Sequence, residues 1–381
     1  MAVVKNREEL RRIIESIVPA DAGMCKDAYD YQEALVKPPG SLGTLEDISI
    51  RLAGITGNLH NSMEKTAVAI FSADNGVVAQ GVASAPQSVT YVQTINFTRR
   101  LTGVGSLAKT FGNDLLVVDV GGAEDYPAAL LADEIGNPVT DKILNRKIAY
   151  GTKDFSEGPA MTEEQVITAI GTGIEAAKGL KDAGYDAFGI GEMGIGNTST
   201  SAAVLSYLAD LTSDETVGKG GGVNKAGYLR KKEIVDESIK RIEKKDDAFD
   251  QIVEVLRQVG GFDIAAMMGA FLGAAAYKLP VVIDGYISAV AALCAFTINP
   301  LVKDYMFTSH QSKEPGYLHA IGAIGVEPMF NLGMRLGEGS GCPISFQIMK
   351  AACGVMNGMA TFEDSKIDTG YLEELDRKED F

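Results

Sequence analysis

Short apolar runs alternate with longer amphipathic stretches through the middle of the chain. The runs contain no regular polar alternation, and most of them are followed directly by Gly, Asp or Asn. An unbroken apolar run of this kind is typical of a strand that is covered on both faces. Strands are therefore predicted at Ala67–Phe71, Leu115–Val118, Ala187–Ile190, Val281–Ile283 and Tyr305–Thr308.

The segments between these runs have the length and spacing of helices. They are Glu163–Leu180, Ser199–Leu208, Leu229–Ile242 and Ile264–Ala276. Strand, Gly-rich loop and helix in alternation predict an α/β fold, in which a parallel sheet has helices on both sides. Such sheets bind their ligands at the carboxyl ends of the strands. The loops that follow the strands are therefore the first place to look for functional residues.

Both terminal segments lack a strand pattern. Helical spacing begins near Arg7, and Leu45–Ile55 is a second helical stretch. We therefore expect residues 1–60 and 342–381 to come together as a small helical domain. The large α/β domain is then residues 61–341.

The composition is that of a folded globular protein. Hydrophobic residues make up 46% and charged residues 23%, which excludes a disordered chain. With 51 acidic and 35 basic residues the net charge is −16, and no block of Lys and Arg occurs, so nucleic acid is a poor candidate partner. The most apolar tract, Ile264–Phe296, is interrupted by Lys278, Pro280 and Asp284, so no membrane span is predicted.

The few Cys and His residues argue against two further classes of protein. The four Cys lie far apart without a CxxC pair, and there are only three His. Reduced thiols in a cytoplasmic protein are the expected state, and a His-based metal site is not predicted. The amino-terminal residues contain no apolar core of a secretory signal, which agrees with a cytoplasmic location.

The most informative loop is GIGEMGIGNTSTSAA, Gly189 to Ala203, which joins a predicted strand to a predicted helix. Its glycines let the backbone approach a ligand, and the free N–H groups of a first helical turn favour an anion. The spacing fits neither a dinucleotide fingerprint nor a triphosphate loop. A monophosphate or carboxylate site remains open, and so does a turn that only packs the helix on the sheet.

Three further segments carry candidate chemistry. In LGMRLGEGSG, Glu338 stands between two glycines and is either a buried general base or a solvated loop carboxylate. The loop ADNGVVAQGVASAPQSVT, with its small side chains and Gln87, either lines a flat pocket for a planar ring or is an ordinary connection. His310, in SHQSKEPGY, either titrates near neutrality or is a hydrogen-bonded structural residue.

Six segments, in chain order, are similar to those of one protein family. They are KPPGSLG (Lys37–Gly43), GIGEMGIGNTS (Gly189–Ser199), GGFDIAAM (Gly260–Met267), PVVIDGYIS (Pro280–Ser288), SHQSKEPG (Ser309–Gly316) and LGMRLGEGSG (Leu332–Gly341). Together they resemble the nicotinate-nucleotide–dimethylbenzimidazole phosphoribosyltransferase family, over nearly the whole chain. The resemblance implies a Rossmann-like sheet, a dimer, and no bound cofactor or metal.

The resemblance also implies a reaction. The 5-phosphoribosyl group leaves the nicotinate of nicotinate mononucleotide and joins a base, with inversion at C1′, in cobamide nucleotide-loop assembly. Glu338 corresponds to the family's general base, which takes a proton from the incoming base. The donor phosphate is expected on Gly194, Gly196, Asn197 and Thr198. Lys231 is expected to neutralise that phosphate, and Glu192 to contact the ribose or to order the loop.

The loop after the first strand departs from the family pattern. Asn75 stands in place of a His, and Ala83 and Ala85 stand in place of a Ser and a Tyr. This loop, with Gln87, is expected to line the acceptor pocket, and Leu336 is expected there too. The acceptor is therefore either dimethylbenzimidazole or a phenol such as p-cresol. Phenol-activating relatives work as two unlike subunits, so the chain could be a homodimer, a heterodimer with a homologue, or a non-catalytic partner subunit.

Overall fold

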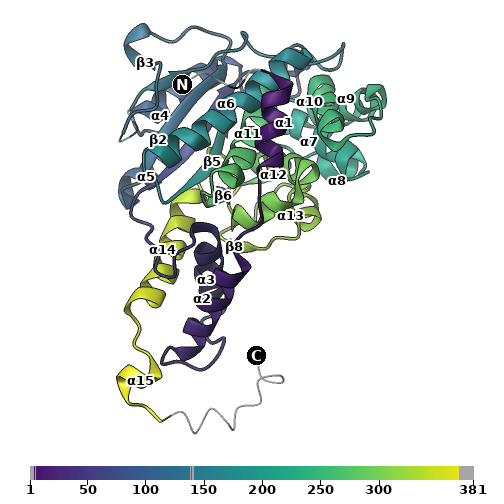
Figure 1. The fold of residues 1–381 in the computed structure, drawn as a ribbon. Helices are drawn as coiled ribbons and strands as arrows, with labels where there is room; N and C mark the ends of the chain where they lie inside the picture. The colour runs from purple at the N-terminus through teal and green to yellow at the C-terminus, as the bar shows by residue number, and fades with distance from the viewer. Residues whose placement is uncertain (1–3, 5, 138, 140, 369–381) are drawn as a thin grey trace.

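Parallel strands form one sheet in the order β3-β4-β2-β1-β5-β6-β7-β8 (Figure 1). The computed structural model describes residues 4, 6–137, 139 and 141–368. The strands are β1 Thr66–Ala73, β2 Asp114–Gly121, β3 Leu131–Ala132, β4 Ile143–Asn145, β5 Ala187–Met193, β6 Val281–Ile283, β7 Met306–His310 and β8 Pro328–Phe330. All five strands predicted from the sequence are present. The additional strands β3, β4 and β8 are at most three residues long and lie at the two ends of the sheet.

Helices cover the sheet, and further helices lie below it in Figure 1. The α-helices are α1 Arg7–Glu15, α2 Ala22–Ala34, α3 Thr44–Thr56, α4 Ser88–Thr98, α5 Gly103–Phe111, α6 Glu163–Asp182, α7 Asn197–Leu208, α8 Ser213–Thr216, α9 Lys225–Ser238, α10 Ala248–Val259, α11 Phe262–Ala276, α12 Tyr286–Ile298, α13 Tyr317–Ile324, α14 Cys342–Gly358 and α15 Phe362–Ser365. Short 3₁₀ helices occur at Gly76–Gln80, Ala128–Leu130, Ile239–Arg241 and Pro300–Tyr305. The four helices predicted between strands are confirmed. No helix of the described residues is both long and apolar enough to cross a membrane.

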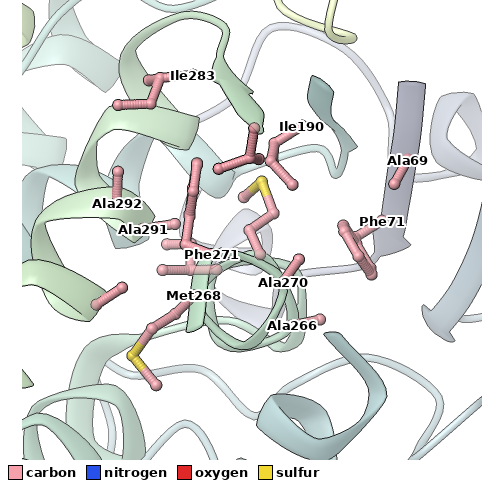
Figure 2. Close-up of a cluster of buried hydrophobic side chains, with 14 of the residues drawn as sticks. Ala69, Phe71, Ile190, Ala266, Met268, Ala270, Phe271, Ile283, Ala291 and Ala292 are labelled. Carbon is pink, nitrogen blue, oxygen red and sulfur yellow. The ribbon is translucent and has the colours of Figure 1, made fainter. Parts of the chain in front are cut away.

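The two faces of the central strands bury against different helices. In β5, Ile190 lies with Phe71 of β1 on the face that α11 covers (Figure 2). On the other face of β5, a Cβ added at Gly189 would lie 2.4 Å from the Cβ and Sγ of Cys342 in α14. Alternate residues of a strand point to opposite faces. The sheet is therefore covered on both sides, which explains why its strands are apolar without alternation.

Helix α11 is the centre of the apolar core. Every residue from Phe262 to Ala275 is buried, and Figure 2 shows Met268 and Phe271 among side chains of the strands and of α12. This helix is apolar all round because β-strands lie on one side of it and α6 and α12 lie on others. It begins at Gly261, close to the carboxyl end of the sheet, where its first turn supplies Asp263 to the site described below.

The amino-terminal and carboxyl-terminal segments meet in a helical unit that lies below the sheet in Figure 1. Ala28 of α2, Ala53 of α3 and Met356 of α14 share a small apolar cluster of their own. Helix α1, predicted as part of this unit, instead packs on α6 and α11, and its Arg7 and Arg11 lie over the ring of Phe249 in α10. The division at residues 60 and 341 stays a prediction, and residues 1–3, 5 and 369–381 of it lie outside the described residues.

Glycines set the distance between α6 and α11, which gives a test of the core. A Cβ at Gly173 would lie 1.8 Å from the carbonyl oxygen of Ala266, so Gly173→Ala must push the two helices apart. Overpacking of this kind costs about 1–3 kcal/mol. We expect a lower urea midpoint for Gly173→Ala. Gly354→Ala, in an open position of α14, is the control and is expected to leave the midpoint unchanged or to raise it. Equal midpoints for both variants would contradict this packing.

Candidate active site

A cavity of about 680 Å³ opens at the carboxyl ends of the strands. Its lining comes from the ends of β5 and β7, from the loops that follow β1, β5, β6, β7 and β8, from the loop between α8 and α9, and from the amino-terminal parts of α4, α7 and α12. The predicted catalytic residue Glu338 lines the cavity. So do all the residues predicted for the phosphate loop, Glu192, Gly194, Gly196, Asn197 and Thr198. The structure thus brings together two segments that are more than a hundred residues apart in the sequence.

Glu338 occupies an unusual backbone conformation. It has a φ of 65°, and its neighbours Gly337 and Gly339 have φ values of 87° and 85°. Left-handed backbone is costly for residues with a Cβ, which is why glycines flank Glu338 and why the turn needs partners from elsewhere in the chain. Those partners are buried carboxylates. Glu192 accepts a hydrogen bond from the Glu338 N–H at 3.2 Å, and Asp284 accepts from the N–H groups that follow.

Glu338 is 7% exposed, and two donors hold its carboxylate. Gln93 of α4 donates from Nε2 to Oε1 at 2.9 Å, and the Val104 N–H donates to Oε2 at 3.2 Å. Val104 lies in the first turn of α5, where the helix dipole favours a negative charge. The acid is therefore not freely solvated, and its hydrogen-bond donors are neutral groups. They fix its direction while one side faces the cavity.

Glu192 and a third buried carboxylate, Asp263, accept hydrogen bonds from the same side-chain amide in the phosphate loop. The Asn197 amide donates to Glu192 Oε2 and, at 3.2 Å, to Asp263 Oδ2. Burial raises the pKa of Glu192, and burial together with the neighbouring Glu192 raises the pKa of Asp263 to about 7. Glu192 and Asp263 therefore favour a positive charge close to them. Where no such charge is present, they tend to be protonated.

Cations border the cavity beside the phosphate loop. The Lys231 side chain is buried, does not line the cavity, and donates to Thr198 Oγ1 at 2.7 Å and to the Gly218 carbonyl at 3.3 Å. Burial lowers the pKa of Lys231 to about 8. Lys219 and Arg335, which no pattern in the sequence singled out, line the cavity directly.

The residues predicted for the acceptor pocket divide into two groups. Ala83, Ala85 and Leu336 line the cavity, beside Val82 and Val89. Asn75 and Gln87 do not line it.

Asn75 and Gln87 instead lie behind the cavity wall. Asn75 is fully buried, with its amide nitrogen 3.1 Å from the point where a Cβ of Gly194 would stand. The Gln87 side chain interacts with buried Asp74. Among the described residues, Asn75 thus packs against the phosphate loop and Gln87 contacts Asp74 at the strand end, and neither side chain lines the cavity.

His310 is buried at the back of the cavity rather than free to titrate near neutrality. Its Nδ1 lies 3.2 Å from Ser309 Oγ and 3.7 Å from Asp284 Oδ1. Burial lowers the pKa of His310 to about 4, so it is neutral at pH 7. Among the described residues, no three His, Cys, Asp or Glu side chains are grouped so that they could hold a metal ion.

Comparisons with known proteins agree with this arrangement. A family model described as "Phosphoribosyltransferase" matches residues 17–367. The nicotinate-nucleotide–dimethylbenzimidazole phosphoribosyltransferase of Clostridium perfringens is 50% identical over 97% of this chain and 98% of its own, and that of Clostridium tetani is 44% identical over the same shares. The crystal structure of CobT from Thermus thermophilus covers 91% of this chain and all of its own, with 33% identity and a TM-score of 0.84.

The fold and these likenesses define a phosphoribosyltransferase, an enzyme of the pentosyltransferase class. The chain belongs to the nicotinate-nucleotide–dimethylbenzimidazole phosphoribosyltransferase family.

The buried acids predict a characteristic dependence of stability on pH. Because the pKa of Asp263 is about 7 in the folded protein and 3.8 ordinarily, the folded state holds this proton more tightly than the unfolded state. Its contribution to stability is complete below pH 4 and is lost as the pH rises through about 7. We expect the free energy of unfolding, measured by urea titration, to fall less between pH 5 and pH 7.5 in Asp263→Asn than in the wild type, by on the order of 1 kcal/mol or more.

The control for this experiment is Asp246→Asn, which alters an exposed carboxylate away from the cavity. Its pH dependence should match that of the wild type. An unchanged slope in Asp263→Asn would mean that Asp263 is ionised throughout.

Proposed function

We propose that this protein transfers 5-phosphoribosyl from nicotinate mononucleotide to an aromatic lower-ligand base, giving the α-ribotide and nicotinate in cobamide nucleotide-loop assembly. The observation that carries the proposal is the Glu338 carboxylate, which two donors hold at a cavity that the Gly194–Thr198 loop also lines. The curated relatives that are 44–50% identical bear the name of this activity, which supports extending it to the chain.

The residues suggest how the transfer proceeds. The donor phosphate rests on the first turn of α7, where N–H groups and the helix dipole favour an anion. Nicotinate leaves from a pyridinium and needs no general acid. Positive charge develops on the ribose at C1′ and is stabilised by Glu192, which lines the cavity, with Asp263 behind it. Glu338 takes the proton of the incoming base as its nitrogen attacks C1′.

The first test removes the proposed general base. Glu338→Gln keeps the size and the hydrogen bonds of the side chain but cannot accept the proton. We expect a folded protein whose turnover, measured as nicotinate released from nicotinate mononucleotide with each candidate base, falls by roughly 10²-fold or more. Glu327→Gln, at an exposed acid outside the cavity, is the control and should keep wild-type turnover. Near-normal turnover by Glu338→Gln would remove Glu338 from the mechanism.

The second test separates the candidate phosphate cations. Lys231→Met removes the buried charge and keeps most of the packing, and Lys219→Ala and Arg335→Ala remove the two charges that line the cavity. A lost charge-assisted contact to phosphate costs about 1.5–3 kcal/mol. If Lys231 serves the phosphate, Lys231→Met should weaken binding of nicotinate mononucleotide and spare the dephosphorylated nucleoside. Equal losses with both donors would place the role of Lys231 elsewhere.

The pH dependence of binding distinguishes Lys231 further. Because the pKa of Lys231 is about 8, its charge is lost as the pH rises through that value. Nucleotide affinity in the wild type should therefore decline above pH 8 more steeply than in Lys231→Met. Parallel curves would contradict a charged Lys231 at the phosphate.

The acceptor is a base or a phenol that fits a wall of small apolar side chains. Ala83 and Ala85 leave open the space that larger residues would fill, and an unfilled apolar gap loses dispersion contacts with dimethylbenzimidazole. A phenol has two requirements: a carboxylate that takes its proton, and an apolar wall against which its ring packs. Glu338 supplies the first, and a partner chain could complete the second. Transfer to a phenol is therefore a second candidate activity.

Direct competition between p-cresol and dimethylbenzimidazole decides between these acceptors. We expect measurable transfer to p-cresol when both products are quantified, with the chain alone or together with a homologous partner. Exclusive use of dimethylbenzimidazole in both conditions would exclude the phenolic activity. A chain that releases nicotinate only with an active homologue, and equally as Glu338→Gln, would be a non-catalytic partner subunit.

The proposal extends to assembly and location. We infer that the enzyme works in the cytoplasm, since its nucleotide substrate belongs to that compartment. We also infer that it works as a homodimer or as a heterodimer with a homologue. Size-exclusion chromatography with light scattering, of the chain alone and of the chain with a homologue, measures the state of assembly.

A further inference from the structure

We propose that Asp284 is a positioning residue for Glu338, acting through the backbone of the turn that carries it. The inference rests on the proposed role of Glu338 as general base. Asp284 immediately follows β6, and its carboxylate accepts two hydrogen bonds from the far side of the turn. The Gly339 N–H donates to Oδ2 at 3.1 Å, and the Gly341 N–H donates to Oδ1 at 2.7 Å.

These two bonds fix the part of the turn whose backbone conformation is the most costly. Residues 337–339 all have positive φ, and the bonds within the turn are those from the Ser340 N–H to the Gly337 carbonyl and from the Cys342 N–H to the Gly339 carbonyl. Glu192 receives the N–H of Glu338 itself. Asp284 holds the residues after Glu338, so the two carboxylates fix the turn from both sides of the base.

The turn amides are the main partners of the Asp284 carboxylate. It is 2% exposed, and its own N–H donates to Ser288 Oγ at 2.9 Å, which fixes the strand end. The nearest ring, that of His310, is neutral at pH 7 and at 3.7 Å offers no charge to pair with. The two amides of the turn are thus the closest partners of a carboxylate that is otherwise costly to bury.

The turn is tightly packed on both sides. A Cβ at Gly341 would lie 2.5 Å from His310 Nδ1 and from Ser309 Oγ, and 2.9 Å from Asp284 Oδ1. On the other side, a Cβ at Gly191 would lie 2.4 Å from the Glu338 carbonyl oxygen. Because the turn packs closely on backbone and on Asp284, we expect the loss of an acceptor at Asp284 to shift the turn. A catalytic group misplaced by about 1 Å can lose on the order of 10²-fold in rate.

The test is Asp284→Asn, with a matched control elsewhere in the sheet. Asn presents an NH₂ group where one backbone N–H needs an acceptor. We expect kcat to fall by roughly 10- to 100-fold, while the KM for nicotinate mononucleotide changes much less, because Asp284 does not act on the phosphate loop. The control residue is Asp119, which is also buried, in β2, and accepts from the Gly121 and Gly122 N–H groups, with Lys147 as an additional partner at 3.1 Å, but lies outside the cavity. Asp119→Asn should lose stability and keep its kcat.

A double-mutant cycle separates positioning from a general structural effect. If Asp284 acts through Glu338, the loss from Asp284→Asn should largely vanish in a Glu338→Gln background. Losses that multiply in the double variant, or a wild-type kcat in Asp284→Asn, would overturn the proposal. Failure of the proposed function is seen separately, because Glu338→Gln alone would then turn over normally. If Asp284→Asn does not fold, Asp284→Ser, which keeps one oxygen acceptor, takes its place in the same cycle.

Discussion

The site depends on one constraint: an acid must project into a cavity from a stretch of left-handed backbone. Such backbone is expensive for Glu338, and glycines on either side lower the cost only for their own positions. Buried carboxylates at two neighbouring strand ends supply the rest, since each accepts an N–H of the turn. The parallel sheet is what brings those strand ends together. Fold and function are therefore linked through the backbone of a single short turn.

The electrostatics of the site follow from the same arrangement. Glu192, Asp263 and Asp284 are buried close to one another, and burial raises the pKa of each. A site of this kind is poorly suited to an anion, yet the proposed donor carries a phosphate. The two requirements are met on different sides of the cavity. In the proposed mechanism, the first turn of α7 and the nearby cations bind the phosphate, and the acids stabilise the positive charge that develops on the ribose.

Much of the fold was accessible from the sequence because the central strands are buried on both faces. Ala67–Phe71 and Ala187–Ile190 are apolar without alternation for that reason, and both are strands. The edge strands β3 and β8 are too short and too exposed to give such a pattern. Helix α1 was recognisable as a helix, but its packing on α6 and α11 was not, because an amphipathic face does not specify which apolar surface it covers.

The site was predictable where backbone conformation leaves a mark on the sequence. The glycines around Glu338 and in the Gly189–Asn197 loop signal special φ values and close approach. Gln93, Val104 and Asp284 leave no such mark, since each is an ordinary residue that the tertiary fold carries to Glu338. The sequence did not predict that Asn75 lies behind the cavity wall, because a position after a strand identifies the end of the sheet but not the direction of a side chain.

A crystal structure with nicotinate mononucleotide and an unreactive analogue of the acceptor tests the central claim most directly. The account predicts the ribose phosphate on the Gly194–Thr198 turn and the acceptor's proton-bearing atom within about 2.6–3.2 Å of a Glu338 carboxylate oxygen. It also predicts that the turn keeps its hydrogen bonds to Glu192 and Asp284. An acceptor bound away from Glu338, with another group within reach of its proton, would contradict the account.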